Sequence, residues 1–314
     1  MEKPHTTPKD FFVWFGAMLS LYWAAIAFIF LFFNYINYTW PNALSYLPNN
    51  PYDSGIGFQM ASIVVFLPVY MVLSWLIRHD IAADPTRKDI WVRRWALILT
   101  LFIAGITMAG DLVTVLAAFF GGEELTGAFL LKVVFLFMVA AVAFMHFIAD
   151  YRGYWEQQPQ YRRRVCWGVG ILAVLTIATG FVLFGSPSAA RQYRFDEQRV
   201  SDLQAIQSQV TYYYQQKREL PPTLASLNSA TLGFSVPSDP VSNAPYEYKL
   251  SSALSFELCA TFERQSLGKN AANELSGPYG RAHDTWDHAE GRTCFTRTID
   301  PAFYPPSPTQ AKPL

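Results

Sequence analysis

The sequence predicts a membrane bundle of five transmembrane α-helices, followed by a small α+β domain outside the cytoplasm. The first observation behind this prediction is composition: 52% of the 314 residues are hydrophobic and only 15% are charged, whereas soluble domains have roughly 25% charged residues. The second observation is that every long apolar run lies before residue 187. A net charge of zero excludes the basic excess that is typical of nucleic-acid-binding proteins.

Five segments are long and apolar enough to cross the roughly 30 Å of hydrocarbon in a bilayer, which takes about 20 residues. They are residues 11–33, 57–77, 95–120, 126–148 and 166–184. The first is interpreted as a retained anchor, because its apolar run is too long for a cleaved signal peptide and no small-residue cleavage pattern follows it. The spans define a membrane domain over residues 1–186.

Lysine and arginine are confined to one side of this bundle. The N-terminal tail and the loops after the second and fourth spans carry two, five and four of them. The loops on the other side, residues 34–56 and 121–125, carry none. Because such residues mark cytoplasmic loops, we expect a bacterial cytoplasmic membrane protein with its N-terminus inside. Five crossings then place the C-terminal domain in the periplasm or outside the cell.

Two ionisable residues, Asp111 and Lys132, lie inside predicted spans, where charged groups are costly and usually paired or functional. They are almost equidistant from a turn at residues 121–122, so an ion pair between them is expected. One interpretation is a buried pair that fixes the register of the two helices. The alternative is a proton or ion pathway with Glu123 at its outer mouth.

His79 and His146 lie near the inner ends of the second and fourth spans. Facing histidines on two membrane helices are able to ligate a haem axially. The other interpretation places both among lipid headgroups. No second feature of the sequence indicates a haem, so no cofactor is expected.

Arg93 and Arg94 lie between Trp91 and Trp95 in the loop after the second span. Basic residues at the inner face of a membrane suit anionic lipid headgroups. The alternative for this pair is docking of a cytoplasmic partner.

The order of motifs through the membrane half carries a family resemblance. The motifs are Asp84-Pro85, Arg93-Arg94-Trp95, Gly110-Asp111-Leu112, Gly122-Glu123 and Phe129-Leu130-Leu131-Lys132. Over about residues 10–155 the chain resembles a bacterial membrane family known only as domain of unknown function 5671. The resemblance implies a membrane location and a fold, and it implies no activity.

The pattern after residue 187 is that of a small soluble α+β domain, predicted over residues 187–299. Apolar residues recur at helical spacing from Arg191 onward, and Pro221 ends the helix. Asp196 and Asp202, toward its start, are interpreted as complements of the helix dipole. Residues 246–250 and 254–262 predict two strands of a hairpin, and the proline-rich residues 300–314 are expected to be disordered.

One long helix, a Leu-Pro turn, an Asp-Pro loop and a strand hairpin follow one another in this domain. The residues are Leu203, Ile206, Leu220-Pro221, Asp239-Pro240, Pro245-Tyr246 and Leu258-Cys259-Ala260. This order resembles the globular half of type II secretion pseudopilins, which implies a pilin-like interaction domain. Some pseudopilins bind calcium in the loop that matches Ser238-Asp239, but one carboxylate is too few here. Because a fifth span precedes the domain, assembly into a pilus is not expected.

Two of the three cysteines, Cys259 and Cys294, fall in the exported domain, where an oxidising compartment favours a disulfide. Strand alternation places Cys259 opposite the apolar face of residues 254–262. Cys294 is therefore expected on a segment laid across the second face of the sheet. The alternative is a pair of free thiols with a catalytic or metal-binding role.

Two histidines and two acids lie close together just before Cys294: His283, Asp284, Asp287 and His288. Such side chains are able to bind zinc or another divalent metal. Their spacing matches no standard zinc pattern, so a structured loop is the interpretation that we favour.

The most direct hypothesis for function is a non-enzymatic envelope anchor. The bundle would sit in the lipid bilayer and present the pilin-like domain to an envelope or extracellular protein. A different class of hypothesis is a small transporter or ion-coupled channel that uses Asp111, Lys132 and Glu123. A third is an electron carrier with haem between His79 and His146.

Overall fold

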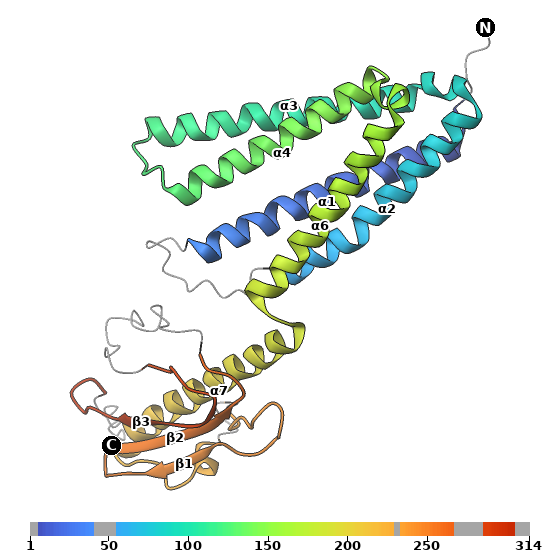
Figure 1. The fold of residues 1–314 in the computed structure, drawn as a ribbon. Coiled ribbons are helices and arrows are strands. Elements are labelled where there is room, and N and C mark those ends of the chain that lie inside the picture. Colours follow the sequence, from blue (N-terminus) through green and yellow to red (C-terminus); the bar gives the residue numbers. More distant parts are fainter. Residues whose placement is uncertain (1–5, 41–54, 229–232, 267–284, 305–314) are drawn as a thin grey trace, which may run out of the picture. The chain divides into compact units, whose positions relative to one another are not determined.

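A computed structural model of the chain describes residues 6–40, 55–228, 233–266 and 285–304 (Figure 1). The described chain divides into two compact units, one ending at Phe184 and one beginning at Gly185. The proline-rich residues from 305 onward, together with His283 and Asp284, lie outside the described residues.

Five helices in the described part of the chain are long and apolar enough to cross a membrane, and all lie in the first unit. They are α1 (Pro8–Thr39), α2 (Ile56–Ala83), α3 (Trp91–Phe120), α4 (Gly127–Tyr151) and α6 (Pro159–Phe184). Each corresponds to one predicted span. Two short helices, η1 (Pro85–Asp89) and α5 (Tyr154–Gln157), connect α2 to α3 and α4 to α6.

Local sequence explains where these helices begin. Pro8 occupies the first turn of α1, and the Thr7 side chain accepts the N–H of Asp10 while Asp10 accepts the N–H of Thr7. This reciprocal capping satisfies two backbone donors that have no partner within the helix. Thr126 caps α4 with a single hydrogen bond, by accepting the N–H of Phe129.

The helices of the first unit pack mainly as two antiparallel pairs, α1 with α2 and α3 with α4 (Figure 1). Toward the N-terminus of α1, Trp14, Ile77, Leu97 and Phe147 share one apolar core. Near the C-terminus of α1, α6 packs against α1 and α2. There Gly180 lies so close to them that an added Cβ would be 2.7 Å from Tyr35 Oη and 2.9 Å from Met60 Sδ.

The second unit combines one long helix with a three-stranded antiparallel sheet. The helix α7 spans Pro187–Lys217, and a short helix η2 spans Leu224–Leu227. The strands are β1 (Glu247–Leu250), β2 (Ser255–Phe262) and β3 (Gly291–Thr298), in the order β1-β2-β3. The predicted hairpin is present as β1 and β2, whereas β3 was not foreseen as a strand.

One apolar face of the sheet packs against α7. Leu203, Ile206 and Val210 on the helix and Phe256, Leu258 and Phe262 on β2 are almost fully buried in this core. The helix begins four residues earlier than predicted, because Ser186 caps it by accepting the N–H of Ala189 and Pro187 occupies its first turn. It ends where Arg218 adopts a left-handed conformation, with φ of 63°.

Candidate functional sites

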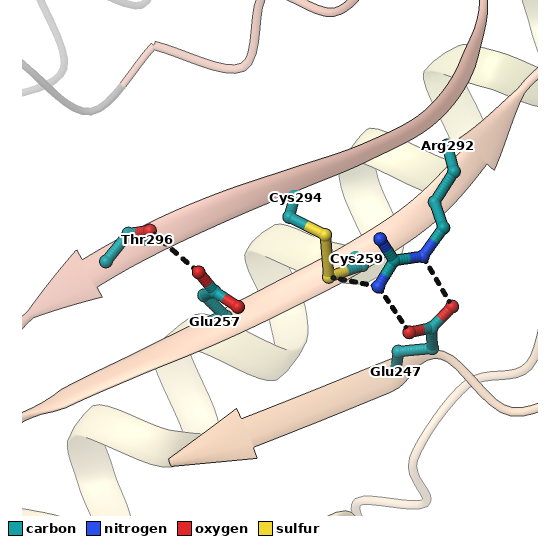
Figure 2. The surroundings of a disulfide bond; sticks show 6 residues. All are labelled: Glu247, Glu257, Cys259, Arg292, Cys294 and Thr296. Atoms are coloured by element: carbon teal, nitrogen blue, oxygen red, sulfur yellow. Dashed lines mark hydrogen bonds and ion pairs between the residues drawn. A yellow bond between two sulfur atoms is a disulfide. The ribbon is translucent and has the colours of Figure 1, made fainter. Parts of the chain in front are cut away.

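The second unit contains the Cys259–Cys294 disulfide that the sequence predicts (Figure 2). Cys259 on β2 and Cys294 on β3 are direct partners in the ladder, with Cα atoms 4.0 Å apart. The expectation that Cys294 lies on a segment crossing the second face is wrong, because Cys294 belongs to the neighbouring strand of the same sheet. Directly opposed residues of antiparallel strands point to the same face. The two sulfurs therefore meet within the sheet, and no further segment has to cross it.

Charged side chains surround this disulfide on the face of the sheet away from α7 (Figure 2). Arg292 Nε and Nη2 donate to the two carboxylate oxygens of Glu247 at 3.0 and 2.7 Å. The same Nη2 lies 3.5 Å from Cys259 Sγ. The hydrogen bond from Arg292 holds the pKa of Glu247 below its usual value. A guanidinium is therefore held in a fixed position beside one sulfur of the bridge.

A second charged cluster is buried at the end of β2 and was missed by the sequence analysis. The Arg199 side chain is only 4% exposed and donates to Asp196 at 2.7 Å and to Asp239 at 2.6 Å. Glu263 lies 3.4 Å from the same guanidinium. These four residues lie on α7, on the Asp-Pro loop and at the end of β2. Their ion pairs hold these three parts of the unit together.

Asp239 is the most strongly perturbed acid of this cluster. Burial alone would raise its pKa, but the hydrogen bonds from Arg199 and from the backbone N–H groups of Ser242 and Val241 outweigh burial and hold the pKa well below its usual range. The loop that matches the calcium site of some pseudopilins therefore has the Arg199 guanidinium against its one carboxylate.

Asp196 and Asp202 do not serve the helix dipole as expected. The helix begins at Pro187, so both lie beyond its first turn, where the dipole effect fades. Asp196 accepts the N–H groups of Glu263 and Arg264 at 3.0 and 2.9 Å. Asp202 accepts the Tyr246 hydroxyl at 2.7 Å, and burial together with this acceptor raises the pKa of Tyr246.

The structure does not bring Asp111 and Lys132 together as an ion pair within the residues that it describes. Asp111 is 6% exposed, and its Oδ2 has no hydrogen-bond partner there. Asp111 lies nine residues before the end of α3, but Lys132 lies five residues after the start of α4. At 1.5 Å per residue their depths differ by about 6 Å. The expectation of equal depth counted both distances from residues 121–122, but the connection runs to Thr126, so its middle lies closer to Lys132 than to Asp111.

The two arginines of the predicted lipid or partner contact have different surroundings. Arg93 is mostly buried, with its Nη2 3.6 Å from Asp150 Oδ1. Arg94 is 60% exposed and pairs with Asp89 at 2.8 Å. The neighbouring Trp91 and Trp95 are exposed as well, so Arg94 is the member of the pair that is available to lipid or to a partner.

A network of further ion pairs joins α1, α2 and η1 near these arginines. Arg87 Nη1 contacts the buried Asp10 at 2.9 Å and Asp80 at 3.7 Å. Asp80 also accepts from Lys9 at 2.9 Å. Lys9 and Arg87 thus fix the ends of α1 and α2 to one another.

Of the four weak metal-ligand candidates, only Asp287 and His288 are among the described residues. The His288 ring stacks on Phe262, with centroids 3.7 Å apart, and is 8% exposed. Burial lowers the pKa of His288. Within the described ranges no group of three or more His, Cys, Asp or Glu side chains could hold a metal ion.

The two histidines of the haem hypothesis each pack against a nearby tryptophan. The ring centroids of His79 and Trp75 are 5.6 Å apart, and those of His146 and Trp155 are 5.0 Å apart. The Trp155 indole also donates to the backbone carbonyl of His146 at 3.0 Å. Haem ligation by the pair stays a prediction, which the visible absorption spectrum of the purified protein would test.

Comparison with known proteins finds one similarity. Residues 10–149 match the family described as Domain of unknown function (DUF5671), in agreement with the resemblance of the motifs in the membrane half. No curated protein and no solved structure matches the chain. The resemblance of the second unit to pseudopilins therefore stays a prediction.

Proposed function

We propose that the chain is a non-enzymatic anchor of the bacterial cytoplasmic membrane that presents its second unit, as a pilin-like interaction domain, to an envelope or extracellular protein. The observation that carries this proposal is the Cys259–Cys294 disulfide, in a unit that begins directly after the fifth apolar helix. Disulfides form and persist in oxidising compartments and are rare in the cytosol. We therefore infer that the second unit lies outside the cytoplasm.

The charges of the helix connections support the same orientation. The connection after α2 contains Arg87 and Lys88 in η1, whereas the α3–α4 connection contains Glu123 and Glu124 and no basic residue. Basic residues are retained on the cytoplasmic side. Five crossings would then put the two termini on opposite sides of the membrane, which agrees with a disulfide outside the cytoplasm.

The presented surface is inferred from the sheet. The face that carries Glu247, Glu257 and Arg292 points away from α7 and is polar (Figure 2). Lys249 lies on the same face, because it is paired directly with Glu257. A polar face with fixed charges suits a reversible protein contact, in which charged groups set orientation and partner choice. The three strands and the disulfide keep this face rigid, so little conformational entropy is lost on binding.

Membrane orientation is tested first, by protease added to intact spheroplasts. Cleavage is expected to remove the region after Arg191 and to spare the η1 connection. The reverse cleavage pattern would rule out the proposed orientation.

The partner is tested next, by a photo-crosslinking amino acid placed at Lys249 on the polar face. It is expected to trap a specific envelope protein in native membranes, whereas the same substitution at Lys88 in η1 is not expected to trap that protein. If Lys249 and the other positions of the polar face trap nothing, the interaction role is refuted.

A second candidate function is ion-coupled transport, and one observation favours it. Asp111 is buried in a long apolar helix, and its Oδ2 lacks a hydrogen-bond partner within the described residues. Intramembrane carboxyl groups of this kind are commonly part of proton or ion pathways. Flux in proteoliposomes, compared between the wild type and Asp111→Asn, tests this candidate, and equal flux in the two proteins argues against it.

A further inference from the structure

The two sulfur atoms of the Cys259–Cys294 disulfide have different surroundings. Cys259 is 1% exposed, whereas Cys294 is partly exposed on the edge strand β3. An external thiol therefore reaches the sulfur of Cys294 more easily than that of Cys259. Access to the sulfur is one of the factors that decide which of the two is attacked in thiol–disulfide exchange.

Arg292 distinguishes the same two atoms electrostatically. Its Nη2 lies 3.5 Å from Cys259 Sγ, and Glu247 holds the guanidinium in place through two further bonds (Figure 2). Nη2 has two hydrogens, so it donates to Glu247 and to the sulfur at once. In the part of the chain that the structure describes, no hydrogen bond to Cys294 Sγ is found. A thiolate that forms at Cys259 is thus stabilised, as a good leaving group requires.

We propose that this disulfide is a thiol-exchange site: the dithiol of an exported oxidoreductase attacks Cys294, and Cys259 is the leaving thiolate. The proposal rests on the location outside the cytoplasm given above. Its substrate class is a protein dithiol, and the polar face around Arg292 is the surface on which that protein would dock.

The exchange balances in two steps. A thiolate of the partner forms a bond to Cys294 Sγ, the Cys259–Cys294 bond breaks, and its electron pair leaves with Cys259. The second thiolate of the partner then attacks the partner's own sulfur in this mixed disulfide and releases Cys294 as a thiolate. The partner is oxidised by two electrons, the chain is reduced by two, and both new thiolates take protons from water.

Strand pairing preserves the site in its reduced form. β2 and β3 are paired at eight positions, from Ser255 opposite Thr298 to Phe262 opposite Gly291. The apolar core lies on the other face of the sheet, between β2 and α7. Opening the bridge therefore leaves both the ladder and the core in place, so Cys259 and Cys294 stay opposed and able to re-form the bond.

Reduced glutathione, a monothiol that cannot resolve its own mixed disulfide, is a suitable probe. The oxidised full-length protein in detergent is exposed to glutathione at mildly alkaline pH, quenched with N-ethylmaleimide and mapped by mass spectrometry without reduction. We expect glutathione on Cys294 and N-ethylmaleimide on Cys259. Arg292→Gln is expected to slow adduct formation by about two- to fivefold, because the thiolate that leaves at Cys259 loses the guanidinium beside it.

A matched control is Lys249→Gln, which removes a cation from the same face without a contact to the sulfur, and it should leave the rate unchanged. Glutathione on Cys259, or equally on both cysteines, overturns the proposal, as does a bridge that stays intact under excess glutathione. If Arg292→Gln fails to fold, the cysteine that receives glutathione in the wild-type protein still tests the proposal. Because purified protein is used, an incorrect membrane orientation would be detected separately, by protease accessibility.

Discussion

Replacing Arg199 with methionine tests how the second unit is held together. The substitution keeps the unbranched stem but removes a guanidinium that is only 4% exposed and that donates to Asp196 and Asp239 at 2.7 and 2.6 Å. Both carboxylates are then left in the interior without a positive partner. Removing one partner of a buried ion pair costs about 3–5 kcal/mol, because the other charge stays buried.

The remaining hydrogen bonds place the expected cost at the lower end of that range. Asp196 retains the N–H groups of Glu263 and Arg264, and Asp239 retains the N–H groups of Val241 and Ser242 and the hydroxyl of Ser242. We therefore expect a loss of about 3 kcal/mol. With an m-value of about 1–2 kcal/mol/M in urea, the unfolding midpoint falls by about 1.5–3 M.

The measurement is pulse proteolysis of the full-length protein in detergent across a urea gradient, following the fragment that contains the second unit. Arg194→Met is the matched control: it removes an exposed arginine from the same helix and should change stability by less than about 0.5 kcal/mol. If Arg199→Met and Arg194→Met unfold at the same urea concentration, the cluster does not hold α7 to the Asp-Pro loop.

Three further predictions concern packing, the disulfide and pH. Gly180→Leu is expected to push α6 away from Tyr35 and Met60 and to lower the free energy of unfolding by about 1–3 kcal/mol, seen as a lower midpoint of thermal unfolding in detergent. Gly170→Leu, whose added Cβ meets nothing within 4 Å, is the control and should leave that midpoint unchanged. Cys294→Ser is expected to lower the stability of the second unit by roughly 3–4 kcal/mol for a loop of this length, seen as a lower urea midpoint; an unchanged midpoint would show that the bridge adds no stability. Because burial lowers the pKa of His288 below its usual 6.5, the unfolded chain binds this proton more readily, and stability should fall as pH drops below about 6.5. His288→Phe keeps the stacking on Phe262 and should flatten the stability profile between about pH 5 and 7, and an equally steep profile in the variant would assign the pH dependence to another group.

The sequence by itself determined the parts of this protein that depend on length, local pattern or compartment. The five long helices follow from runs of apolar residues, which need no knowledge of the packing. The β1–β2 hairpin follows from alternation around a short turn, and the pairing of Cys259 with Cys294 follows from two cysteines in one segment that the loop charges predict to be exported. Each of these inferences uses residues that are neighbours in sequence or a pairing that has a single solution.

Tertiary structure alone decided the contacts between residues far apart in the chain. Arg199 meets Asp239 and Glu263 only because α7, the Asp-Pro loop and the end of β2 converge, and nothing in a local pattern marks Asp196 as a buried acceptor rather than a dipole complement. Whether Asp111 and Lys132 meet depends on how α3 and α4 pack and on where the middle of their connection lies, and a shift of four residues moves a side chain by about 6 Å along a helix. The two sulfurs of the disulfide are equivalent in the sequence; only β-ladder register, which places Arg292 and Glu247 beside Cys259, makes them chemically different.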